Sequence, residues 1–311
     1  MITALNSRVF LLVAAMTVLA LPGSAHDAEK LPATSAEGLL ANLEGTSGAR
    51  LGVYALNTED GAVIRYRADE RFPLCSTFKL ILVSAILGRS AQVADLLQQR
   101  IHFEKSDLVS YSPLSEKHVA DGMTVAELCA AAIQYSDNTS ANLLMKLLGG
   151  PPAVMAFARS IGNNEFRLDR WEAELNTAIP GDIRDTVTPS AMGCSLQSLA
   201  LGKALSAPRR SQLNEWLRGN TTGAKRIRAA VPAGWQVGDK TGSGDYGTAN
   251  DVAVLWPPGR KPIILAIYHT QKEADAKACD EIIAAAAQIV IRAFAAPRAT
   301  LAELSDEKPA R

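Results

Sequence analysis

The chain has 311 residues and a mass of 33.1 kDa, which suits one large domain or two interlocked lobes. Its 48% hydrophobic and 21% charged residues are ordinary globular values and exclude wholesale disorder. Basic and acidic residues number 32 each, so the basic excess of a nucleic-acid-binding protein is missing. The four histidines form no His-x-x-x-His or His-x-His pair, which argues against a zinc hydrolase. We therefore expect neither a nucleic-acid partner nor a bound metal.

Residues 1–25 predict a secretory signal peptide. Arg8 supplies the positive charge, residues 9–21 form an apolar run, and Gly-Ser-Ala at 23–25 suits a signal peptidase. The run is shorter than the roughly 20 residues of a membrane span, which makes an uncleaved anchor the weaker alternative. We expect export to the periplasm and no membrane attachment after cleavage.

The part of the chain that follows predicts strands and then helices. After a short helix at 37–43, strands are expected at 50–57 and 62–67, with a hairpin turn at 59–61. Helical periodicity then runs through much of the chain. It covers residues 77–87, 125–135, 140–148, 153–161, 190–206 and 211–218.

Residues 162–189 have no clear period, and a loop of this length inside a compact domain is usually functional. The last third of the chain returns to strands. They are expected at 235–241, 250–256 and 263–269, followed by a helix at 274–294. The charged residues 297–311 are expected to be disordered.

This order of elements predicts an α/β fold of the α+β type. Helices flank an antiparallel sheet built from both chain ends, and an all-α lobe is inserted between the two groups of strands. The expected division is a signal peptide (1–25), an α/β lobe (26–67 and 219–296), an all-α lobe (68–218, with loop 162–189) and a tail (297–311). The crevice between the lobes is the expected place for a site.

Ser76 and Lys79 are the first residues that suggest chemistry. They stand three apart where a helix is expected to begin, so they share one face of it. A serine hydroxyl becomes a useful nucleophile beside a base, and a lysine away from water can have a lowered pKa. A helix N-terminus also offers N–H groups to a developing oxyanion. Taken alone, the pair is equally explained by a capping serine and a solvated lysine.

Two further tripeptides lie at element boundaries. Ser-Asp-Asn at 136–138 falls between two expected helices, and Lys-Thr-Gly at 240–242 ends an expected strand. Each has an ordinary explanation, helix capping for the first and an edge lysine before a turn for the second. Their occurrence together, after Ser-x-x-Lys and in this order, is hard to attribute to chance.

With the loop motif Arg-Trp-Glu-Ala-Glu-Leu-Asn at 170–176, this set resembles the class A serine β-lactamases. The resemblance extends from about residue 37 to residue 294, and the run at 240–248 is similar to that of the cefotaxime-hydrolysing branch. It implies a β-lactamase that acts on small-molecule β-lactam antibiotics, without a cofactor and as a monomer.

The resemblance implies a role for each catalytic residue. Ser76 would attack the lactam carbonyl to form an acyl-enzyme, with Lys79 taking part in proton transfer. Ser136 would pass a proton to the leaving nitrogen. Glu172 and Asn176 would hold the water that hydrolyses the acyl ester. Whether Lys79 or Glu172 is the base for acylation stays open.

Substrate binding is also implied by the resemblance. The expected residues are Tyr111, Asn138, Arg226, Lys240, Thr241, Gly242 and Ser243. Asn138 would hold the side-chain amide of the substrate, Tyr111 would form an aromatic wall, and the cation Lys240 would face the carboxylate. Backbone N–H groups of Ser76 and Ser243 would form the oxyanion hole.

Many penicillin-hydrolysing relatives carry an arginine where this chain has Ala249, so that cation is missing here. Arg226 falls where some broad-spectrum relatives place a substitute, and the resemblance therefore assigns it to the carboxylate of the substrate. Arg226→Ala is accordingly expected to weaken binding of an anionic substrate more than Arg228→Ala does.

The loop from 162 to 189 should be pinned by an Arg170–Asp185 pair, again by resemblance. A cis peptide is expected after Glu172, although the next residue is alanine instead of the proline common in the family.

Four cysteines, at 75, 129, 194 and 279, form no Cys-x-x-Cys pair, and buried free thiols are the favoured interpretation. Two bridges that occur in relatives cannot form, because the partner of Cys129 would be Val83 and that of Cys75 would be Gly244.

The expected substrates are penicillins and cephalosporins, including oxyimino-cephalosporins, with poor turnover of carbapenems and inhibition by clavulanate-type compounds. One alternative is a penicillin-binding D-Ala-D-Ala peptidase, which lacks a deacylating glutamate such as Glu172 with its Asn176. The other is a non-catalytic β-lactam sensor, which is normally tethered to a membrane or a signalling domain. A persistent adduct on Ser76 would favour either of them.

Overall fold

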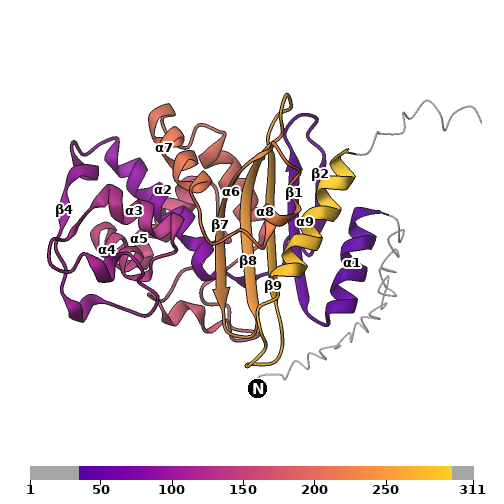
Figure 1. Ribbon diagram of the computed structural model, residues 1–311, viewed down its shortest axis with the longest axis horizontal. Helices are drawn as coiled ribbons and strands as arrows, with labels where there is room; N and C mark the ends of the chain where they lie inside the picture. The colour runs from indigo at the N-terminus through magenta and orange to yellow at the C-terminus, as the bar shows by residue number, and fades with distance from the viewer. Residues whose placement is uncertain (1–34, 296–311) are drawn as a thin grey trace, which may run out of the picture. The chain divides into compact units, whose positions relative to one another are not determined.

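The computed structural model describes residues 35–295, which contain a five-stranded antiparallel sheet. Its order is β2 (Val63–Tyr66), β1 (Arg50–Asn57), β9 (Ile263–Thr270), β8 (Thr248–Trp256) and β7 (Gln236–Gly244). Strand β1 pairs with β9 along its whole length, so the two ends of the described chain meet in the middle of the sheet (Figure 1). The expected antiparallel sheet built from both chain ends is confirmed.

The sheet buries both of its faces. Along β9, Ile264, Ala266 and Tyr268 join one apolar cluster, while the alternating residues Ile263 and Leu265 join the other. This is the period of two of a pleated strand. All eight residues of β9 are buried, and the strand is therefore almost continuously apolar.

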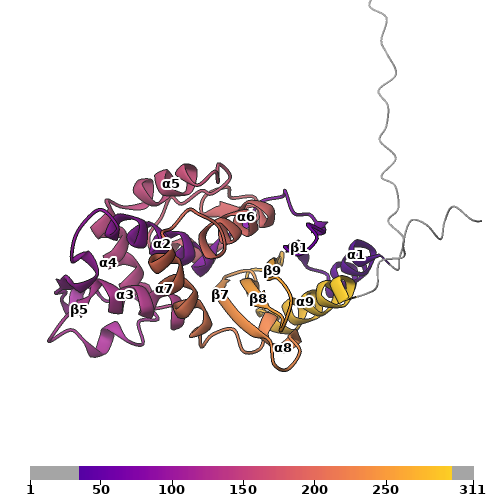
Figure 2. The ribbon, with the colours of Figure 1, turned by 90° about the horizontal axis from the view of Figure 1, so that it is seen from above.

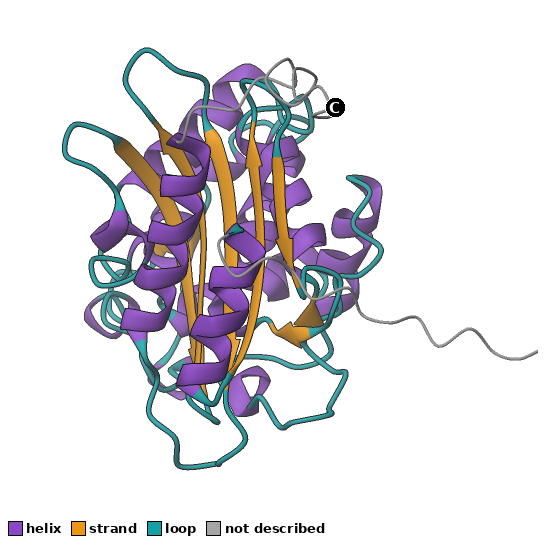
Figure 3. Ribbon diagram, turned by 90° about the vertical axis from the view of Figure 1, so that its right-hand side faces the viewer, coloured by secondary structure: helices purple, strands orange, loops and turns teal. Residues whose placement is uncertain are grey.

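Helices cover the sheet from both sides. On one face lie α1 (Ala36–Ser47), α9 (Asp280–Ala295) and the short α8 (Ile227–Ala230), which pack against one another (Figure 3). On the other face, α6 (Pro189–Ala200) packs against β1, β8 and β9. Helix α6 falls within the segment expected to form the all-α lobe, so this segment supplies one whole layer over the sheet.

The remaining helices surround α2 (Phe78–Ser90), whose residues are all buried except Gly88 and Arg89. Its neighbours are α3 (Val125–Gln134), α4 (Asn138–Leu148), α5 (Pro151–Ser160) and α7 (Ala207–Arg218) (Figure 2). A helix buried on every side is apolar on every side. Lys79, in its first turn, is a clear exception to that pattern and points to a functional reason.

Short elements connect the larger ones. They are the strand pairs β3 (Phe72–Pro73) with β6 (Thr186–Val187) and β4 (Arg100–Ile101) with β5 (Met123–Thr124), and the 3₁₀ turns η1 (Cys75–Thr77), η2 (Leu96–Gln98), η3 (Lys105–Asp107), η4 (Ser115–Lys117) and η5 (Glu174–Thr177). The β3–β6 pair ties the end of the long loop to the segment that leads into η1.

Several helix ends differ from the sequence expectation. The helix expected at 190–206 ends at Ala200, ahead of Gly202, because glycine is a poor helix former. The helix expected from 211 begins at Ala207, since Pro208 is tolerated in a first turn. The last helix begins at Asp280, six residues late, with two acidic side chains at its positive end. The expected signal peptide and the expected disordered tail lie outside the described residues.

Within residues 35–295, no single helix is long and apolar enough to cross a membrane, and only α4 and α5, bent by 76° relative to each other, pass that test as a pair. The same part of the chain holds no group of three or more His, Cys, Asp or Glu residues placed to bind a metal.

Replacing Leu265 by alanine tests the apolar cluster between the sheet and α9. Its side chain is fully buried between the sheet and α9, so Leu265→Ala should lower the free energy of unfolding by about 2–5 kcal/mol. Val63 on the edge strand β2 is 42% exposed, and Val63→Ala should change it by less than about 0.5 kcal/mol. Urea denaturation of both variants measures the difference; equal effects would contradict the packing described here.

Candidate active site

Ser76 lies in the turn η1, directly before α2, and strand β7 passes close over it. A Cβ atom on Gly242 would stand 3.0 Å from the carbonyl oxygen of Leu74 and 3.2 Å from the backbone nitrogen of Ser76. Glycine at 242 therefore allows β7 to approach the backbone N–H of the serine. The role of Gly242 in the Lys-Thr-Gly motif is to admit this close contact.

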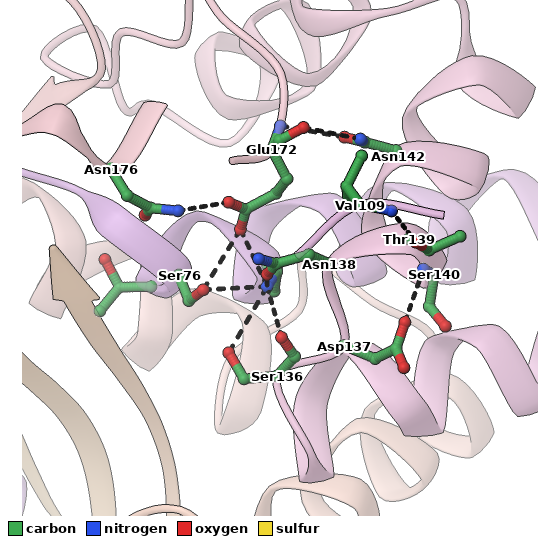
Figure 4. Close-up of polar contacts among 12 residues, drawn as sticks. Ser76, Val109, Ser136, Asp137, Asn138, Thr139, Ser140, Asn142, Glu172 and Asn176 are labelled. Atoms are coloured by element: carbon green, nitrogen blue, oxygen red, sulfur yellow. Dashed lines mark hydrogen bonds and ion pairs between the residues drawn. The ribbon is translucent and has the colours of Figure 1, made fainter. Parts of the chain in front are cut away.

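Ser76, Lys79 and Glu172 meet in a buried triangle. Figure 4 shows the Ser76 and Glu172 side chains turned toward each other. The Lys79 ammonium donates to Ser76 Oγ over 2.9 Å and lies 2.9 Å from Glu172 Oε1. Ser76 Oγ donates to the same carboxylate oxygen over 3.3 Å. The serine proton can thus leave toward Glu172 directly, or toward Lys79 once Lys79 has lost a proton of its own, and these are the two open acylation routes.

A second cation faces the same site. Lys79 Nζ also donates to the backbone oxygen of Ser136 over 2.8 Å and to Asn138 Oδ1 over 2.6 Å. Lys240 Nζ donates to Ser136 Oγ over 3.1 Å. The Ser136 hydroxyl, 3.5 Å from Lys79 Nζ, therefore lies between two ammonium groups.

Burial lowers the pKa of both lysines. For Lys79 the neighbouring Glu172 carboxylate opposes the shift. For Lys240 the pKa falls to about 7, because burial and the positive charge of Lys79 both disfavour its charged form. Lys240 forms no ion pair among residues 35–295, although the buried carboxylates of Asp239 and Asp251 oppose the fall of its pKa.

The Ser-Asp-Asn motif owes its shape to a helix cap. Asp137 is the N-cap of α4 and accepts from the backbone N–H of Ser140 over 2.8 Å. Its carboxylate also accepts from the backbone N–H of Leu114 over 2.9 Å. The capping interpretation therefore holds for the middle residue, while Ser136 and Asn138 on either side of it face Lys79.

Glu172 is held by two asparagines. The side chain of Asn142 accepts from the Glu172 backbone N–H over 3.0 Å and donates to its C=O over 2.9 Å. Asn176 Nδ2 donates to Glu172 Oε2 over 2.5 Å. The buried Asn176 Oδ1 has no hydrogen-bond partner among the described residues and can accept one. The peptide that follows Glu172 is cis, as the resemblance implies.

The two ends of the long loop are joined by Arg170 and Asp185, with Nε 2.5 Å from Oδ2. Arg170 Nη1 also donates to Thr177 Oγ1 over 2.8 Å. The buried Asp185 accepts in addition from the backbone N–H groups of Asp169 and Arg170, and its C=O accepts from Leu74 N over 2.8 Å. The ion pair thus connects the loop to the segment that carries the serine.

A cavity of about 510 Å³ opens above Ser76. Of the residues singled out from the sequence, it is lined by Ser76, Tyr111, Ser136, Asn138, Asn176, Arg226, Thr241, Gly242 and Ser243. Tyr111 stands at its rim with 61% of its surface exposed. The structure brings these residues together from η1, α4, η5, β7 and the loops between them. Lys79, Glu172 and Lys240 lie beneath the lining residues.

Sequence reasoning missed several members of this site. The cavity is also lined by Ser110, Ala173, Thr177, Thr222 and Asp245, and Asn142 fixes the backbone of Glu172. A signal existed for Asn142, which lies one helical turn beyond Asn138 on α4. None existed for Thr222, whose neighbourhood is set by the tertiary fold.

Arg226 is buried against the site and largely occupied. Its guanidinium pairs with Asp280 at 2.7 Å, donates to the backbone oxygens of Gly242 and Asn250, and donates to Ser243 Oγ over 2.7 Å. It therefore reaches the cavity chiefly through the Ser243 hydroxyl.

Arg228 was chosen from the sequence as the comparison for Arg226, but it forms a structural ion pair of its own. Its Nε lies 2.6 Å from the fully buried Asp239 carboxylate. Removing one member of a buried ion pair costs about 3–5 kcal/mol. Arg228→Ala is therefore unsuitable as a mild control.

All four cysteines are free. Cys75 and Cys129 are buried, as expected, whereas Cys194 is exposed and Cys279 is half-buried. Burial raises the pKa of the Cys75 thiol, which keeps it protonated beside the site.

Taken together, a buried serine beside a lysine, a carboxylate with an amide neighbour and a second buried lysine form the residue set of a serine hydrolase. Comparison with known proteins supplies the family. Residues 36–294 match the model of the beta-lactamase enzyme family, and the chain belongs to that family.

Individual relatives are similar over most of their length. The carbapenem-hydrolyzing β-lactamase KPC of Klebsiella oxytoca is 60% identical over 252 residues, which cover 81% of this chain and 86% of the relative. The β-lactamase CTX-M-97 of Escherichia coli is 56% identical over 262 residues, 84% of this chain and 90% of the relative. A crystal structure of a β-lactamase from Desulfarculus baarsii superposes with a TM-score of 0.84 at 58% identity, covering 86% of this chain and all of that one. The chain is a class A β-lactamase, an enzyme that hydrolyses β-lactams.

The pKa of Lys240 predicts a pH dependence. Because the ammonium loses its proton near pH 7, kcat/KM for a β-lactam with a free carboxylate should fall about tenfold between pH 6 and pH 8. In Lys240→Arg the guanidinium keeps its charge over this range, so the fall should flatten. Initial rates at substrate concentrations well below KM measure both profiles; the same fall in both proteins would contradict the assignment to Lys240.

Proposed function

We propose that Ser76 is the nucleophile that opens the β-lactam ring and carries the acyl group. The observation that supports this most directly is the buried triangle, in which Lys79 Nζ and Glu172 Oε1 lie 2.9 Å and 3.3 Å from Ser76 Oγ. The serine proton passes to this pair as the Ser76 Oγ–carbonyl bond forms. The backbone N–H groups of Ser76 and Ser243 stabilise the oxyanion at the cavity wall.

The leaving nitrogen receives its proton from Ser136. The hydroxyl of this serine lies within reach of both ammonium groups, so Lys79 can restore the proton that Ser136 gives away. The proton taken from Ser76 thus reaches the ring nitrogen, and the C–N bond breaks without a charged amide leaving group.

Deacylation is assigned to Glu172 and Asn176. The carboxylate takes a proton from a water molecule, whose oxygen attacks the ester carbon, and that proton passes to Ser76 Oγ as the ester bond breaks. Asn176 orients the carboxylate through Nδ2 and offers Oδ1 to the same water. The Arg170–Asp185 pair acts on this step by holding the loop in place, because a displacement of about 1 Å can cost about a hundredfold in rate.

Substrate binding is shared between two groups of residues. Lys240, Thr241 and Ser243, with Arg226 behind Ser243, hold the carboxylate of the substrate. On the opposite side, Asn138 binds the amide of the substrate side chain. The exposed ring of Tyr111 forms the outer wall of the cavity.

We also propose that the enzyme acts as a monomer, as the family resemblance implies. We place the boundary between the sheet-containing lobe and the helical lobe near residues 67 and 219, with the cavity between them, and we assign α6 as the contact layer.

The family match begins at residue 36, after the expected signal peptide, which supports export to the periplasm.

The substrates we propose are penicillins and cephalosporins, including oxyimino-cephalosporins, with poor turnover of carbapenems. The thiol of Cys75 is free, and residue 244 is a glycine without a bridge to it. One relative is named for carbapenem hydrolysis, so imipenem is the decisive compound. We expect a kcat/KM for imipenem at least a hundredfold below that for cefotaxime, on the order of 3 kcal/mol in transition-state binding; efficient imipenem turnover by the pure enzyme would exclude this assignment.

The central test follows hydrolysis of a cephalosporin together with the intact mass of the mature enzyme. The wild-type protein should turn over many times with little lasting adduct. Glu172→Gln should lower kcat at least about a hundredfold and accumulate an acyl adduct on Ser76, because the general base is lost. Glu174→Gln, an exposed change two residues away in the same loop, serves as the control and should leave kcat unchanged.

A stable adduct on the wild-type protein would favour a D-Ala-D-Ala peptidase or a β-lactam sensor instead. A Glu172→Gln variant that clears its adduct as fast as the wild type would remove Glu172 from deacylation.

A further inference from the structure

One wall of the cavity contains a hydroxyl pair that none of the sequence motifs includes. Thr222, in the segment between α7 and α8, lines the cavity beside Thr241. Their Oγ1 atoms lie 2.5 Å apart, which is a short hydrogen bond between two hydroxyls. Either oxygen can be the donor, so the direction of this bond depends on what else each hydroxyl contacts.

The direction is set by Asn220. The backbone N–H of Thr222 can only donate, and it points at Asn220 Oδ1 over 3.1 Å, so that atom of the amide must be the oxygen. On the other side Asn220 Nδ2 donates to Asp239 Oδ2 over 2.6 Å. The amide is therefore locked with its oxygen toward Thr222, whose Oγ1 lies 2.8 Å away.

Asp239 in turn is fixed in position by Arg228. It is fully buried, and Arg228 Nε donates to its Oδ1 over 2.6 Å. A Cβ atom on Gly223 would stand 2.0 Å from Asp239 Oδ2, so the segment that carries Thr222 can lie this close only because residue 223 is glycine. This series of contacts, from Arg228 through Asp239 and Asn220 to Thr222, thus holds Thr222 in place at the cavity wall.

Each threonine hydroxyl has one proton, and this permits two arrangements. With the cavity free of an anion, Thr222 donates to Asn220 Oδ1 and Thr241 donates to Thr222, which leaves the lone pairs of Thr241 toward the cavity. With a carboxylate in the cavity, Thr241 turns its proton to the anion and Thr222 turns its own to Thr241. Only two hydroxyl protons move, and Asn220 Oδ1 loses the Thr222 hydroxyl proton but keeps the Thr222 backbone N–H.

We propose that Thr222 is a positioning residue for anionic substrates: its backbone N–H contact with Asn220 holds it beside Thr241, and its hydroxyl turns its proton to Thr241 so that Thr241 donates to the substrate carboxylate. The proposal rests on the proposed function, in which Thr241 binds that carboxylate. A hydroxyl that accepts from one neighbour donates more strongly to the next, so Thr222 strengthens the bond from Thr241 to the anion. Its effect belongs to binding and therefore to KM.

The test compares Thr222→Val with Thr221→Val, the same substitution one residue earlier. Thr221 is exposed and donates to the backbone oxygen of Gln134, away from the cavity. For benzylpenicillin, Thr222→Val should raise KM about three- to tenfold, the value of one hydrogen bond, and leave kcat within about twofold. Thr221→Val should match the wild type, and Thr222→Ser should restore the wild-type KM.

The methyl ester of benzylpenicillin separates positioning from a general distortion of the cavity. It lacks the anion, so wild-type enzyme and Thr222→Val should share one KM for the ester. Thr222→Ala, which adds no volume, provides the same comparison if the valine variant does not fold.

A KM that rises equally for the acid and the ester, or a loss confined to kcat, would overturn the proposal. So would a Thr222→Val variant that behaves like Thr221→Val. Absence of turnover by the wild-type enzyme would instead refute the proposed function, and the two failures are therefore distinct.

Discussion

The site depends on the burial of two ammonium groups beside one hydroxyl. Lys79 and Lys240 are both fully buried, and both reach Ser136. Burying a cation away from water is costly unless it is paired. Lys79 has Glu172 as its counter-charge, whereas Lys240 has no ion-pair partner in the described part of the chain. The buried carboxylates of Asp239 and Asp251 act on Lys240 only from beyond ion-pair distance and oppose the fall of its pKa.

The loop from 162 to 189 is held by several contacts, and it carries Glu172, the counter-charge of Lys79. Glu172 is useful only if it reaches Lys79 and Ser76 from a segment without regular structure. Three contacts bring it there, namely the Arg170–Asp185 pair, the Asn142 side chain on its backbone, and the short strand pair β3–β6. The rigidity that the chemistry needs is therefore supplied by side chains from α4 and by the buried Asp185.

Arg226 and Arg228 contact the cavity wall through hydrogen-bonded neighbours. Arg226 donates to Ser243 Oγ, and the contacts that begin at Arg228 reach Thr222 beside Thr241, so both of these β7 hydroxyls have buried groups behind them. Long side chains held in this way lose little further freedom when a substrate arrives.

The sequence by itself determined the strands, the helical middle, the family and the residues of the motifs, because these depend on local periodicity and on residue types at fixed spacing. It could not determine the start of α9 at Asp280, since boundaries depend on caps and tertiary packing. It also could not place Thr222 beside Thr241 or Arg228 against Asp239, which lie 19 and 11 residues apart in the chain. Only the tertiary structure decided these contacts, because the approach of one segment to another is set by the packing of α7, β7 and a glycine with no side chain to keep them apart.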